Sequence, residues 1–101
     1  MFDKLLEARQ KAEEIKKRLD HITVIGEAEG GLIKVTATGN KEVTEINIDA
    51  EFRSSADKEE LEELLVVAVN NALNQANQVN QAEMQGVAKD MLGGLGGLFG
   101  Q

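Results

Sequence analysis

Residues 22–49 read ITVIGEAEGGLIKVTATGNKEVTEINID and set the architecture of the chain. Apolar and polar residues alternate with a period of two through residues 22–28, 32–38 and 42–49, which is the pattern of half-buried β-strands. Two glycine-containing pairs, Gly30-Gly31 and Gly39-Asn40, separate these runs. Gly39-Asn40 is a two-residue connection of the kind that adopts a primed turn, because Gly and Asn tolerate the positive φ that such a turn requires. The sequence therefore predicts a three-stranded antiparallel meander.

The alternation assigns the side chains of this meander to two faces. The inward face is expected to contact the helices and comprises Ile22, Val24, Ile33, Val35, Ala37, Ile46 and Ile48. The opposite face is mostly polar, but it also holds Ile25, Leu32 and Val43. These three residues are either single exposed side chains, which are common, or part of a subunit contact.

One helix is expected before the meander along the chain, and another after it. Residues 2–20 show the apolar spacing of an amphipathic helix. A longer helix is expected from about Asp57 to Lys89, with Ser54 and Ser55 as the signal for its start. Its apolar arc is wide, which indicates contact with the sheet and also with another helix or subunit. Its second half is rich in Asn and Gln, a surface that either rests on a partner or is solvated.

These elements predict an α+β fold with the order α-β-β-β-α. The chain of 101 residues is large enough for one hydrophobic core and too small for two, so residues 1–90 are expected to form a single domain. Residues 91–101 read MLGGLGGLFGQ, and this much Gly favours a flexible, disordered tail.

Charge is distributed unevenly along the chain. The formal net charge is −7, which argues against binding a polyanion by overall attraction. Six of the eleven Lys and Arg residues nevertheless lie within the first eighteen positions, and five of them flank the apolar stripe of the first helix. Residues 49–63 hold seven acidic and two basic side chains. The first helix is therefore expected to pack on its own sheet, to meet an acidic partner or to present its cations to a polyanion. Acidic residues at helical spacing from these cations favour a different interpretation, an ordinary solvated helix with ion pairs along its surface.

Several classes of function lack the residues that they need. The chain has no Cys and a single His, His21, and neither of its two Ser residues lies in a nucleophile-elbow sequence. The glutamates of residues 59–63 diverge around a helix, which does not suit a metal site. No segment reaches the length of a membrane span, and the N-terminus lacks the apolar run of a signal peptide. An enzyme is therefore not expected, which leaves binding or assembly as the class of function.

The order of elements, together with four short segments, resembles the YbaB/EbfC family of bacterial nucleoid-associated proteins. The segments are GLIKVTATGN at 31–40, INID at 46–49, LEEL at 61–64 and AVNNA at 68–72. The resemblance covers nearly the whole chain. It implies a homodimer shaped like tweezers, whose projecting helices form a DNA-binding surface, a location on the chromosome in the cytoplasm, and no cofactor.

Carried over residue by residue, the resemblance makes the first helix the DNA contact, through Lys4, Arg9, Lys11, Lys16, Lys17 and Arg18. The leading hypothesis is a dimeric nucleoid-associated protein that binds duplex DNA mainly through phosphates, with little sequence preference. The alternative is a dimeric protein-interaction scaffold that recruits a protein through its acidic helix or its Gly-rich tail, with incidental DNA contact. A small-molecule enzyme built around His21 ranks last.

Overall fold

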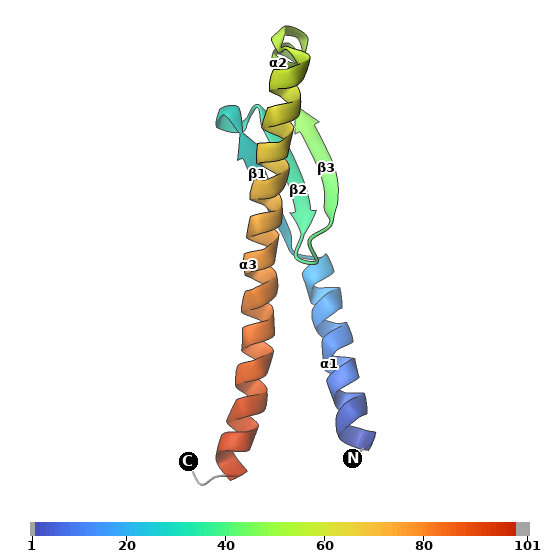
Figure 1. Ribbon diagram of the computed structural model, residues 1–101. Helices are drawn as coiled ribbons and strands as arrows, with labels where there is room; N and C mark the ends of the chain where they lie inside the picture. The colour runs from blue at the N-terminus through green and yellow to red at the C-terminus, as the bar shows by residue number, and fades with distance from the viewer. Residues whose placement is uncertain (1, 99–101) are drawn as a thin grey trace.

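The structure is a computed structural model that describes the backbone of residues 2–98 and the side chains of residues 3–89. Its elements, in chain order, are α1 (Phe2–Asp20), β1 (Thr23–Ala28), the 3-10 turn η1 (Glu29–Gly31), β2 (Ile33–Thr38), β3 (Val43–Ile48), α2 (Ala50–Ser55) and α3 (Lys58–Leu98). The predicted α-β-β-β-α order is confirmed. The molecule measures 65 × 25 × 17 Å. Helices α1 and α3 are antiparallel, so the N-terminal end of α1 and the C-terminal end of α3 lie at the same end of the molecule, and α2 lies at the other (Figure 1).

The three strands form one antiparallel sheet in the order β1-β2-β3, as the alternation predicts. Paired residues project from the same face, so Gly26, Val35 and Ile46 form one row on the inward side. The register of β2 and β3 shifts between Thr36 and Ala37, so that Ala37 pairs with Val43. This β-bulge moves Val43 to the inward face, and its assignment to the opposite face is therefore wrong.

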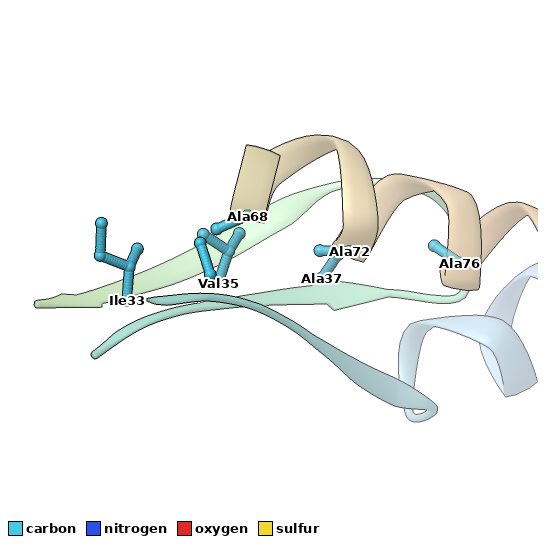
Figure 2. Packing of buried hydrophobic residues seen from close by; sticks show 7 residues of the cluster. Ile33, Val35, Ala37, Ala68, Ala72 and Ala76 are labelled. Carbon is cyan, nitrogen blue, oxygen red and sulfur yellow. The ribbon is translucent and has the colours of Figure 1, made fainter. Parts of the chain in front are cut away.

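Small residues bring α3 directly onto the sheet. Ala68, Ala72 and Ala76 of α3 are fully buried against Ile33, Val35 and Ala37 of β2, as Figure 2 shows. A Cβ atom at Gly26 would lie 2.2 Å from the backbone nitrogen of Ala72, so β1 and α3 touch through their backbones. The core is consequently thin, and Leu19, Ile33 and Val35 are its largest fully buried side chains.

The Asn- and Gln-rich part of α3 has a structural function at the free edge of β1. Asn71 Nδ2 donates to the carbonyl oxygen of Glu27 at 3.0 Å, and Gln75 Nε2 donates to that of Ile25 at 2.8 Å. These carbonyls point away from β2 and would otherwise be open to another strand. One turn of α3 therefore closes this edge of the sheet.

Helix α3 lies over β1 and β2 and leaves β3 beside it (Figure 1). Ile46, which is expected in the core, is 49% exposed for this reason. Its predicted face is right, but its predicted burial is wrong, because a single helix is too narrow to cover three strands.

The turn between β2 and β3 differs from the predicted primed turn. Neither Gly39 nor Asn40 has a positive φ, and the left-handed residue is Lys41, with φ of 66°. Gly39 is needed for another reason, since a Cβ atom there would lie 2.8 Å from Leu19 Cδ2. The amide of Gly39 donates to the carbonyl oxygen of Leu19, and Asn40 Nδ2 donates to the carbonyl oxygen of Lys16 at 2.9 Å and to the Asp20 carboxylate. The turn thus holds the C-terminal end of α1.

The start and the end of the long helix also differ from expectation. Ser54 and Ser55 end the short helix α2, whose N-cap is Asp49, and α3 begins only at Lys58. The backbone of α3 continues to Leu98, where the sequence favours a disordered tail from Met91. Glycine weakens a helix by about 1 kcal/mol per residue but does not clash with it, unlike Pro, which the chain lacks. Residues 99–101 of the expected tail lie outside the described residues.

Candidate nucleic-acid interface

Helix α1 is anchored at one end only. Ile15 and Leu19, near its C-terminal end, are buried, whereas Leu5 is 64% exposed and Ala8 and Ala12 are also exposed. The predicted apolar stripe is therefore covered over its last two turns and open before them. The N-terminal part of the helix projects beyond the sheet, beside the C-terminal part of α3 (Figure 1).

All six cations proposed as DNA contacts are exposed on this projecting helix. Two of the six, Lys11 and Arg18, lie on the side that faces α3. The remaining four cations of the set are Lys4, Arg9, Lys16 and Lys17. Within residues 3–89, no ion pair of 4.0 Å or less joins two residues of α1, so the expected pairing of its cations with neighbouring carboxylates is not found there. Apart from Arg18, the α1 cations in this part of the chain have no carboxylate within 4.0 Å and are available to an external anion.

Arg18 is the member of this set with an ion-pair partner outside the helix. Its Nη1 atom lies 3.9 Å from Oε2 of Glu83 on α3, and the Arg18 side chain remains 62% exposed. An exposed pair at this distance contributes little to stability. A phosphate oxygen could therefore replace the Glu83 carboxylate as the partner of Arg18.

A cleft between α1 and α3 consists of two adjoining hollows that share Arg18 and Val87. One has a volume of about 180 Å³ and is lined by Lys11, Glu14, Ile15, Arg18 and Val87. The other has a volume of about 320 Å³ and is lined by Arg18, Ala82, Glu83, Gly86, Val87 and Lys89. Lys89 thereby joins the α1 cations, although it is 71 positions beyond Arg18 in the sequence. Sequence reasoning missed it because only the antiparallel packing of the helices brings these residues together.

The opposite end of the molecule is acidic. Residues 49–63 include α2 and the first turns of α3, and their seven carboxylates are exposed. No group of three or more His, Asp or Glu side chains in the described part of the chain is arranged to hold a metal ion. His21 is exposed at the junction of α1 and β1. This acidic end lies far along the long axis from the N-terminal part of α1, although α1 itself carries five exposed carboxylates beside its six cations.

The sequence profile of the YbaB/EbfC DNA-binding family matches residues 1–91. The chain belongs to this family. A nucleoid-associated protein of Flavobacterium johnsoniae is 41% identical over 89 residues, which are 88% of this chain and 82% of that protein. A nucleoid-associated protein of Chlorobium phaeobacteroides is 38% identical over 93% of this chain and 83% of its own length. The resemblance seen in the sequence is therefore confirmed.

The fold also occurs in a crystal structure of an uncharacterized Helicobacter pylori protein. The superposition has a TM-score of 0.62 and covers 86% of this chain and 98% of the other, at 20% identity. At that identity the likeness supports the shared fold alone. None of the helices within residues 2–98 is both long and apolar enough to cross a lipid bilayer.

Proposed function

We propose that this YbaB/EbfC family member is a nucleoid-associated protein that binds duplex DNA as a homodimer, mainly through phosphate contacts and with little sequence preference. The observation that carries the proposal is the exposure of six cations on α1, whose N-terminal part projects beyond the sheet at the opposite end from the acidic residues 49–63. Nucleoid-associated relatives support the same function and a location on the bacterial chromosome in the cytoplasm.

Phosphate contact fits the chemistry of this surface better than reading of base edges. Lys and Arg side chains along an exposed helix reach phosphates in many orientations and release counterions from DNA. The chain has no Trp or Tyr and only three Phe residues for base stacking. A homodimer would present two copies of the cationic helix, so that an acidic subunit could still offer a continuous positive surface.

The first test compares two charge reversals of equal size. The variant Lys11→Glu with Arg18→Glu changes the α1 surface, and Lys34→Glu with Lys58→Glu changes the sheet and the acidic end of α3 by the same number of charges. We expect the first variant to weaken binding to duplex DNA by about tenfold or more in a mobility-shift titration, because each reversal removes a phosphate contact and adds repulsion. We expect the second to bind within about twofold of the wild type.

A salt series on the wild type supplies the second readout. If a dimer neutralises about six phosphates, the logarithm of affinity falls against the logarithm of salt concentration with a slope near −5. A flat salt response, or equal losses in the two double variants, would contradict phosphate binding through α1.

A protein-interaction scaffold is the second candidate function, and the exposed carboxylates of residues 49–63 favour it. A scaffold would retain its partner after nuclease treatment and lose it on removal of residues 91–101. A DNA-binding protein would show the salt response above with purified components alone.

A further inference from the structure

The cleft between α1 and α3 has the size of a small-molecule site. Such sites have volumes of about 300–1,000 Å³. The larger hollow of the cleft, of about 320 Å³, reaches this range alone, and the smaller one adds about 180 Å³ beside it. The side chains that line the two hollows therefore indicate what kind of small molecule would fit.

Part of the cleft wall is apolar, and part of it is bare backbone. Ile15 of α1 is almost fully buried beneath the smaller hollow, and the half-buried Val87 of α3 lines both hollows. Gly86 lines the larger hollow, where a Cβ atom would meet no neighbouring atom within 4 Å. Glycine inside a helix is destabilising relative to Ala, and within residues 3–89 no packing contact requires it here. The missing side chain leaves room for a flat group to lie against α3.

The charged side chains of the cleft are mixed in sign. Arg18 lies where the two hollows meet, with Lys11 in the smaller hollow and Lys89 in the larger. Each hollow also holds one carboxylate, that of Glu14 in the smaller and that of Glu83 in the larger. The described lining thus offers donors for an anion and acceptors for hydroxyl or amino groups.

A nucleotide matches this combination of groups. Its phosphates accept hydrogen bonds from Lys and Arg, its ribose hydroxyls donate to carboxylates, and its base is flat with apolar faces. A phosphate chain alone would place like charges beside Glu14 and Glu83. Duplex DNA has no ribose 2′-hydroxyl, and its bases are stacked inside the helix. The cleft therefore suits a free nucleotide better than it suits a DNA strand.

Arg18 can change its partner at little cost. Its Nη1 atom lies 3.9 Å from Oε2 of Glu83, and the side chain is 62% exposed, so the pair contributes little to stability. A phosphate at Arg18 would release the Glu83 carboxylate to accept from a ribose hydroxyl or a base amino group.

We propose that the cleft between α1 and α3 binds a nucleotide, with its phosphates at Arg18 and its base against Gly86 and Val87. The site goes beyond the proposed function, which concerns duplex DNA. Lys11 and Arg18 belong to the cleft and also to the proposed DNA contacts, so a bound nucleotide competes with DNA for them. This competition, unlike the site itself, rests on the proposed function.

The first test fills the cleft and leaves every charge in place. We expect Gly86→Leu to weaken the binding of ADP by about tenfold or more in isothermal titration calorimetry, because the new side chain occupies the space of the base. Leu is a better helix former than Gly, so the variant should fold. Ala88→Leu is the matched control, since it adds the same side chain to α3 at an exposed position that lines neither hollow. It should bind ADP within about twofold of the wild type, and equal affinities in the two variants would overturn the proposal.

The second test varies the ligand on the wild-type protein. We expect ADP and UDP to bind about tenfold or more tightly than pyrophosphate, which carries the same two phosphates without ribose and base. Equal affinities for the three ligands would reduce the site to general attraction of phosphate to cations. No binding of ADP or UDP at millimolar concentration would overturn it altogether.

The third test removes one cation at a time. We expect Lys89→Ala to weaken ADP binding by about fivefold, because it removes a phosphate partner in the larger hollow. Lys58→Ala makes the same substitution at the acidic end of α3 and should have an effect of less than about twofold. Equal losses in the two variants would show that total charge, rather than the cleft, governs nucleotide binding.

The two proposals can fail separately, because ADP binding is measured without DNA and DNA binding is measured without nucleotide. Where both occur, ADP should release a labelled duplex at concentrations at which pyrophosphate does not. Binding of both ligands at once would overturn the competition and leave the nucleotide site intact.

Discussion

At Gly26 the absence of a side chain allows a strand and a helix to meet through their backbones. A Cβ atom there would lie 2.4 Å from the carbonyl oxygen of Ala68, in addition to its clash with the nitrogen of Ala72. Neither atom belongs to a flexible side chain, so the helix as a whole would have to move. This one residue therefore sets the distance between α3 and the sheet, and with it the position of the cleft beside α1.

We expect Gly26→Ala to lower the free energy of unfolding by about 3 kcal/mol, measured by urea denaturation, because the added methyl group overpacks a backbone contact. Gly86→Ala is the control, since a Cβ atom at Gly86 has no atom within 4 Å and Ala is the better helix former. The control should stabilise the protein by about 0.5–1 kcal/mol. Similar midpoints for the two variants would mean that the close approach at Gly26 has no energetic importance.

At the scale of the element, α1 is a helix whose position depends on a turn far away in the sequence. Asn40 and Gly39 bind its last carbonyls, and Ile15 and Leu19 supply its buried contact with the rest of the molecule. The cations before Ile15 therefore project from a base that the β2–β3 turn holds in place.

We expect Asn40→Ala to increase amide hydrogen exchange through residues 3–19, because the loss of these hydrogen bonds removes about 1 kcal/mol of local stability. Exchange in the part of α3 that contacts the sheet should not change. The control is Asn74→Ala, which replaces an exposed amide on α3 and should leave α1 as protected as in the wild type. Unchanged exchange in α1 after Asn40→Ala would show that its apolar contacts alone hold it.

The elements and the cationic helix could be predicted from the sequence because both depend on local spacing. Alternation within six or seven residues defines each strand, and the cations of α1 lie within eighteen positions of one another. The exposure of Ile46 and the addition of Lys89 to the cleft both depend on where α3 lies on the sheet, whereas the pairing of Val43 with Ala37 follows from a bulge between β2 and β3 that the alternation does not reveal. The position of α3 follows from Gly26 and three alanines, residues that carry little signal by themselves.

At the scale of the whole molecule, which is 65 Å long, the acidic residues 49–63 lie at the far end from the N-terminal part of α1. The Debye length at physiological ionic strength is about 8 Å, so carboxylates at the α2 end would act only weakly on DNA bound at α1, as we propose. On the proposed binding by α1, net charge is therefore a poor guide to the affinity for DNA, and we expect the carboxylates within the cleft to have the larger effect.

We expect Glu83→Gln to raise DNA affinity by about two- to fivefold at 0.15 M salt, because it removes the carboxylate that competes with phosphate for Arg18. Conversion of Glu59, Glu60, Glu62 and Glu63 to Gln removes four negative charges at the far end and should change affinity by less than about twofold. Fluorescence anisotropy with a labelled duplex would measure both variants. A larger gain from the fourfold variant than from Glu83→Gln would show that overall charge governs binding.

The side-chain amides of Asn71 and Gln75, which donate to carbonyls of β1, restrict how sheets of different copies can pair. A sheet with two open edges can add copies without limit and grow into a fibre. Here the side chains of Asn71 and Gln75 already fill the positions that an incoming strand would need. Strand pairing between copies would therefore be confined to the β3 edge, and a ladder built through that edge alone could join two sheets but could not extend further.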